Sequence, residues 1–299
     1  MKKDITYLLF VLFVTTLFTG CNNSNNTFQN DNDTLNNAIT IEHTKKVKKI
    51  FYNVPSPIEM ANVLHESGAQ YKPEILVPFK AVDKYVNVPK QALILGVYGS
   101  DLSYVRLFDQ IQQSINYLSS IKKLTGDLNI PEEQGSFAVN RLENNMDNRD
   151  SLLQIVTETY SSANTYLKEN ERGNTATLII LGGWIEALYI STNIVDFDNP
   201  KNKQVINRIA EQKYSLSNLI ELIKGYPNDK ELKEYLPLMN NLHNEFSLVD
   251  IKYEKRDVVT DENKKLTTIN SIATINISKS TFEEIKKTIT EIRNKIIIY

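Results

Sequence analysis

The spacing of apolar residues along the chain predicts a body made mainly of helices. Val105, Phe108, Ile111, Ile115 and Leu118 recur at intervals of three and four, which places them on one face of an α-helix. This stripe predicts a single helix that begins near residue 90 and ends at Gly126 and Pro131. Further helices are expected over 57–67, 132–146, 152–167, 176–195, 201–224 and 229–246, the last of them kinked or split by Pro237.

Towards the C-terminal end the pattern changes from a helical period to strict alternation. Apolar and polar residues alternate over 249–254 and again over 273–277, with a turn at 261–263 between them, and this pattern indicates a β-hairpin near 249–277. A last helix with a regular apolar face follows, and Ser280 and Glu283 are expected to cap it. The expected fold class is mainly α: a multi-helix bundle with a β-hairpin before the C-terminal helix, forming a single domain over 50–299.

The first twenty residues have the pattern of a secretory signal. Two lysines precede residues 5–18, where eleven of fourteen residues are apolar or aromatic. A bilayer-spanning helix needs about 20 such residues, whereas a signal-peptide core is of this shorter length. Residues 1–20 are therefore predicted to be a cleaved signal peptide.

Thr19, Gly20 and Cys21 follow this core directly, and Cys21 is the one cysteine of the chain. The segment resembles the lipobox of bacterial lipoproteins, although Phe18 stands where Leu, Val or Ile is usual. The resemblance implies cleavage after Gly20, a diacylglyceryl thioether on Cys21 and an acyl chain, typically palmitate, on the new amino terminus. The alternative is an uncleaved anchor with a free cysteine.

Residues 21–49 are expected to form a flexible tether, because eight of the sixteen residues over 22–37 are Asn and such a segment cannot join a core. The lipid on Cys21 would make the membrane a partner of the chain. By resemblance to other lipoproteins, Asn22 after the cysteine favours the outer membrane of a bacterial cell envelope. The periplasmic and the surface face stay open.

Residues 51–64, 96–104 and 181–190 are similar to segments of uncharacterised helical lipoproteins of the Bacteroidota. The resemblance covers most of residues 50–296. It implies an envelope context and carries no known activity.

Composition and charge exclude several classes of protein. With 34 basic and 36 acidic side chains the formal net charge is -2, so a nucleic-acid partner held by bulk charge is not expected. His43, His65 and His243 show no metal-ligand spacing, and HExxH, GxSxG and the Walker lysine motif are absent. No metal site, cofactor or catalytic signature is therefore predicted.

Glu186 is the most informative residue of the body, because it is the one charged side chain in the apolar segment 176–195. An ionised carboxylate is costly to bury unless it is paired. Either it lies in an apolar pocket, with Trp184 as a wall and Tyr189 nearby, or it is a structural carboxylate tied to an arginine. Arg106, Arg141 and Arg149 are the expected arginines in the second case. A membrane-spanning 176–195 is disfavoured, because the carboxylate would lie in mid-bilayer.

Asp101, Tyr104 and Asp109 form a second candidate cluster. Their spacing is consistent with the first two turns of a helix, where acidic side chains favourably meet the helix dipole. Alternatively, the two carboxylates could face one cleft and act as acid and base in a glycosidase-like hydrolysis.

Two functions remain open from the sequence. The first is a membrane-anchored lipoprotein whose helical domain binds an envelope protein or a small-molecule ligand, or acts as a scaffold. The alternative is a cell-envelope hydrolase that uses the carboxylates of Asp101, Asp109 and Glu186.

Overall fold

The computed structural model describes residues 67–131, 169–261 and 266–299, together with 141, 145, 151 and 165–167; for 255–261 and 266–272 it describes the backbone only. The expected signal peptide, Cys21, the tether and Arg149 lie outside this part of the chain, and so do the expected helices over 132–146 and 152–167 apart from residues 141, 145 and 165–167. So does the expected helix over 57–67, except for its last residue.

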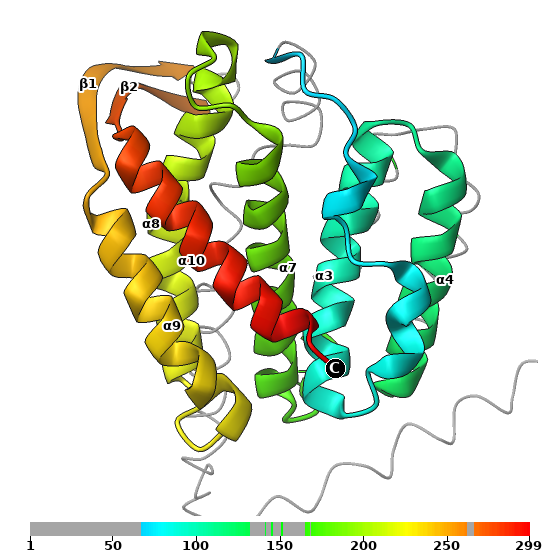
Figure 1. Cartoon of the computed structure of the whole chain (residues 1–299). Helices are drawn as coiled ribbons and strands as arrows, with labels where there is room; N and C mark the ends of the chain where they lie inside the picture. The colour runs from blue at the N-terminus through cyan, green and yellow to red at the C-terminus, as the bar shows by residue number, and fades with distance from the viewer. Residues whose placement is uncertain are drawn as a thin grey trace, which may run out of the picture. The chain divides into compact units, whose positions relative to one another are not determined.

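The described part is mainly α, with one β-hairpin before the C-terminal helix (Figure 1). The expected fold class is confirmed. The helices are η1 (Pro73–Ile75), η2 (Phe79–Lys84), α3 (Val88–Leu107), α4 (Ile111–Asp127), α7 (Gly173–Ile194), η3 (Pro200–Asn202), α8 (Lys203–Lys224), α9 (Lys230–Ser247) and α10 (Lys279–Ile297), and the strands are β1 (Asp250–Asp261) and β2 (Leu266–Asn276).

Helix α7 lies at the centre of the bundle. It packs against α3 on one side and against α8 and α10 on the other, while α4 covers α3 and α9 packs between α8 and α10. Its side chains are buried along nearly its whole length, which explains why its sequence is apolar all round rather than on one face.

Glycines bring the backbones of α3 and α7 into contact. A Cβ atom on Gly96 would lie 2.0 Å from the carbonyl oxygen of Ile179, and one on Gly182 would lie 2.0 Å from that of Leu93. Ser100 Oγ donates a hydrogen bond to the Gly183 carbonyl oxygen at 2.8 Å across the same crossing. The glycines of α7 therefore accommodate the backbone of another helix.

The single helix expected from residue 90 to Gly126 is wrong. The chain breaks between α3 and α4, where Asp109 adopts a left-handed φ of 54°. Ile111 and Ile115 are exposed on α4, because the break rotates α4 away from the direction that a continuous helix would take. The regular spacing from Val105 to Leu118 spans two helices by coincidence.

Two further details differ from expectation. Of the two outcomes expected at Pro237, the split does not occur, because helix α9 runs continuously through this residue. Helix α10 is capped by Ser278, whose Oγ accepts a hydrogen bond from the Thr281 backbone N–H at 3.0 Å, rather than by Ser280. Its predicted apolar face is confirmed, since Phe282, Ile285, Ile289, Ile292 and Ile296 are all buried.

The hairpin pairs β1 with β2 in antiparallel register, with Ile251 opposite Ile275 and Tyr253 opposite Ala273. Ile251 and Ile275 pack against the core, and the ring of Tyr253 lies 6.3 Å from that of Tyr214 on α8. The apolar residues of the alternating pattern therefore lie on the face of the hairpin base that packs against the helices.

Residues 71–79, which contain η1 and the first residue of η2, form a strap that precedes α3 and lies against the bundle. Its backbone is bound by side chains of α3 and α4: Tyr117 Oη donates to the Val77 carbonyl oxygen at 2.8 Å, and Tyr98 Oη donates to that of Pro78 at 3.1 Å. Buried backbone groups outside helices and sheets need such partners. The hydroxyl groups of these tyrosines therefore donate the hydrogen bonds to strap carbonyls that a neighbouring strand would donate in a sheet.

Candidate functional site

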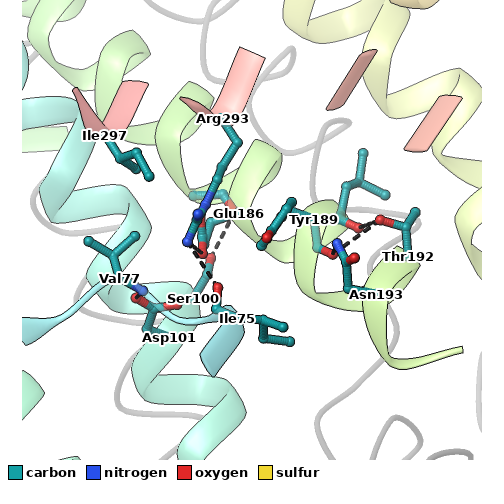
Figure 2. A network of polar contacts seen from close by, with 12 residues as sticks. Ile75, Val77, Ser100, Asp101, Glu186, Tyr189, Thr192, Asn193, Arg293 and Ile297 are labelled. Carbon is teal, nitrogen blue, oxygen red and sulfur yellow. Dashed lines mark hydrogen bonds and ion pairs between the residues drawn. The ribbon is translucent and has the colours of Figure 1, made fainter. Parts of the chain in front are cut away.

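Glu186 of α7 and Arg293 of α10 form a buried ion pair (Figure 2). Glu186 comes from the centre of α7 and Arg293 from the last turns of α10. Arg293 Nε lies 3.0 Å from Glu186 Oε2, and Nη2 lies 3.1 Å from Oε1. This two-point geometry is the strong form of a carboxylate–guanidinium contact.

Arg293 also joins the strap and α7 to α10. Its Nη2 donates a hydrogen bond to the Ile75 carbonyl oxygen at 2.9 Å, and its guanidinium carbon lies 4.2 Å from the centre of the Tyr189 ring. Figure 2 shows the guanidinium between Glu186 and the backbone of Ile75. One side chain therefore links three segments that are far apart in the sequence.

Asp101 lies next to this pair on α3. Its side chain is fully buried, and Oδ2 accepts a hydrogen bond from the Val77 backbone N–H of the strap at 3.3 Å. Its side chain also shares a hydrogen bond with the side chain of Glu186. Asp101 and Glu186 are close enough for their charges to interact.

The surroundings decide which carboxyl group carries a proton. Burial raises the pKa of Asp101 well above its usual range, and the negative charge of Glu186 raises it further. Burial also raises the pKa of Glu186, but the charge and hydrogen bonds of Arg293 act in the opposite direction. We therefore assign the proton to Asp101, which leaves one carboxylate for the one guanidinium and a neutral cluster in the core.

The structure brings together some of the residues predicted from the sequence and separates the others. Asp101, Glu186 and Tyr189 meet around Arg293. Trp184 is buried on another face of α7, where its Nε1 lies 3.4 Å from Gln212 Oε1 of α8, so it does not line the surroundings of Glu186.

Tyr104 and Asp109 are not part of this cluster. Tyr104 Oη accepts a hydrogen bond from the Lys72 backbone N–H at 2.9 Å and so belongs to the strap. Asp109 is exposed in the turn between α3 and α4. The expectation that Asp101, Tyr104 and Asp109 occupy the first turns of a helix is wrong, because Asp101 and Tyr104 lie well inside α3.

The partner of Glu186 is an arginine, as one of the two alternatives predicted, but it is Arg293 and not one of the three arginines that were named as examples. Arg106 lies on α3, and the bidentate contact comes instead from Arg293 on the last helix. One signal was available in the sequence. Arg293 follows Ile289 by four residues in α10 and therefore lies beside the apolar stripe rather than opposite it.

No group of three or more metal-ligating side chains occurs among the described residues. Within the same part of the chain, α7 alone is long and apolar enough to cross a membrane, and 78% of its most apolar 18-residue window is buried inside the protein. A central position in the bundle accounts for this composition.

The cluster is suited to holding the fold together rather than to turning over a substrate. Asp101 and Glu186 have no solvent-exposed surface, and acid–base catalysis requires a carboxyl group within hydrogen-bond reach of the substrate.

No family model, curated protein sequence or solved structure matches the chain.

Proposed function

We propose that this protein is a lipid-anchored lipoprotein of a bacterial cell envelope, favouring the outer membrane, and that its helical domain acts by binding or as a scaffold. The observation that carries the proposal is the position of Cys21. The one cysteine of the chain follows directly on a hydrophobic leader that is too short to span a bilayer. Dual or triple acylation there would anchor the chain stably, where one acyl chain would be marginal.

The described fold supports a binding role more than the hydrolase alternative. Two of the three candidate carboxylates, Asp101 and Glu186, are fully buried, and Glu186 forms an ion pair with Arg293. Asp109 lies apart from them in an exposed turn. No observation therefore favours carboxylate catalysis as a second function.

The anchor is tested by replacing the proposed lipidation site. Cells that express the full chain are grown with labelled palmitate, and wild type is compared with Cys21→Ala and with the matched control Ser24→Ala. Wild type and the control should carry label and stay with the membranes, whereas Cys21→Ala should be unlabelled and soluble. An inhibitor of lipoprotein signal peptidase should make the wild-type precursor accumulate. If Cys21→Ala is held by the envelope as firmly as wild type, the anchor is wrong.

The binding role is tested with the full lipidated chain. Purification from envelopes of the source bacterium should recover one component at a constant stoichiometric ratio, and that component should rebind after separate purification. Repeated recovery of the chain alone, from membranes solubilised under several conditions, would count against the binding role.

A further inference from the structure

Four apolar side chains are exposed together at one end of the bundle. Val86 and Val88 lie between η2 and the first turn of α3, with 81% and 47% of their surface exposed, and Ile298 and Tyr299 follow α10, with 64% and 65% exposed. Figure 1 shows the chain end marked C beside the first turn of α3. We call these four residues the end patch.

The end patch is held in place by the residues beneath it. The ring of Tyr85 lies 5.3 Å from that of Tyr299, and Tyr85 Oη donates a hydrogen bond to the Ile297 carbonyl oxygen at 3.0 Å. Lys90 Nζ donates to the Lys295 carbonyl oxygen at 2.8 Å and so caps the end of α10. These contacts tie the end of α10 to Tyr85 and to the first turn of α3.

The border of the patch carries cations and a tyrosine. Lys84 is exposed, and its Nζ lies 4.3 Å from the centre of the Tyr299 ring. Acidic residues also lie near this end of the bundle: Asp83 Oδ1 is 3.6 Å from Lys123 Nζ, and Glu234 Oε2 is 3.0 Å from Lys295 Nζ, so each has a lysine partner. Aliphatic side chains bordered by tyrosine and lysine have the chemistry of proteins that rest in a membrane interface, where the cation stays at the headgroups.

From this arrangement we infer that the end patch rests on an anionic lipid surface and inserts Val86, Val88 and Ile298 among the headgroups. The inference rests on the proposed function, because the lipid on Cys21 would keep the body close to that surface. A specific protein–protein interface uses roughly 20–30 residues on each side, far more than this patch offers. A weak contact suffices for an anchored chain, because tethering makes the second contact intramolecular.

The anchor alone does not determine which end of the body meets the membrane. Residues 21–66 could reach roughly 150 Å if fully extended, several times the length of a helix in this bundle. The end patch supplies the orientation: it places η2 and the last turn of α10 at the headgroups, and the hairpin base with Leu248 away from them.

The inference is tested by labelling one position of the full lipidated chain. With Cys21 acylated, Ile298→Cys carries the one free thiol, and an environment-sensitive fluorophore on it reports contact with lipid. The matched control is Leu248→Cys, whose native side chain is 70% exposed outside the patch. The baseline is the same label on a chain that also carries Cys21→Ala, in buffer without vesicles.

In vesicles of phosphatidylglycerol and phosphatidylethanolamine the label at 298 should shift to the blue and be quenched by nitroxide lipids, and the label at 248 should not. Lys84→Glu should reduce the shift at 298 in these vesicles at least twofold and leave the small shift in neutral phosphatidylcholine unchanged.

A label at 298 that stays as water-exposed as that at 248, while the chain remains bound to the vesicles, overturns the inference and leaves the anchor intact. So does a shift that occurs in native envelopes but not in lipid vesicles, which would indicate a protein partner. A chain that leaves the vesicles altogether contradicts the proposed anchor instead.

Discussion

Arg293 joins three separate segments in the interior of the described part of the chain. It neutralises Glu186 and binds the strap through the Ile75 carbonyl oxygen. A buried ion pair contributes little net stability relative to a well-packed apolar pair, but breaking one partner leaves the other as an uncompensated buried charge. The pair therefore specifies how α7, α10 and the strap meet.

Glu186→Gln should destabilise the protein by about 3–5 kcal/mol, because the amide leaves the Arg293 charge without a counter-ion in the core. The measurement is urea unfolding of the purified full chain, followed by circular dichroism. The matched control is Glu211→Gln, since the Glu211–Arg208 pair is partly exposed on α8, and it should cost less than about 1 kcal/mol. Equal losses in the free energy of unfolding for the two variants would show that burial does not make the Glu186–Arg293 pair more costly to break than a partly exposed pair.

Asp101→Asn should stabilise the protein at neutral pH. An acid whose pKa is raised in the folded state is protonated there at a pH where the unfolded chain is already ionised, so stability is lost as the pH rises above the ordinary pKa of aspartate. An amide is neutral at every pH and still offers an oxygen to the Val77 N–H.

The stability difference between Asp101→Asn and wild type should therefore be larger at pH 7 than at pH 3.5, where most Asp101 side chains are protonated in the unfolded as well as in the folded state. Urea unfolding at the two pH values measures it, and other groups cancel because they titrate in both proteins. The same difference at both pH values would mean that Asp101 is ionised in the folded protein.

At the scale of the elements, the contact between α3 and α7 depends on small residues. Gly96 and Gly182 leave no room for a Cβ, so the two backbones meet directly. The close contact also explains why α3, like α7, is buried on most of its faces.

Gly96→Ala should destabilise the protein by about 1–3 kcal/mol or more, because its Cβ would force the two helices apart. Gly126→Ala is the matched control: Gly126 also lies in a helix, with nothing within 4 Å of its added Cβ, and alanine there should stabilise by about 0.5–1 kcal/mol through helix propensity. Thermal unfolding of both variants measures the difference. A Gly96→Ala protein as stable as Gly126→Ala would refute the close packing.

At the scale of the whole molecule, stability should be distributed unevenly. Helices α3 and α7 share the buried core, whereas the hairpin is a two-stranded sheet that packs on the helices through its base, around Ile251 and Ile275. Two-stranded hairpins are marginally stable by themselves.

Hydrogen exchange followed by mass spectrometry should therefore show the amides of α3 and α7 exchanging only through global unfolding. The strand amides beyond Tyr253 should exchange at least tenfold faster, through local opening. Exchange of the hairpin as slow as that of α7 would contradict this distribution.

The sequence by itself determined the local structure wherever one pattern dominated. The apolar face of α10, the alternating base of the hairpin and the apolar length of α7 could each be read from residue spacing, because burial of one face selects the period. It also identified Glu186 as a carboxylate needing a partner, and Asp101, Glu186 and Tyr189 as candidates that the fold then brings together. The lipidation of Cys21 stays a prediction from sequence.

The tertiary structure determined where the helical stripe breaks and which distant residues pair, and residue spacing along the chain does not contain this information. The break at Asp109 interrupts a stripe that is regular along the chain, because a local left-handed residue rotates α4 relative to α3. Glu186 and Arg293 are 107 residues apart, and the strap is bound by tyrosines of two helices. Such pairings depend on which helix faces meet in space, and a one-dimensional pattern records only which residues of one element share a face.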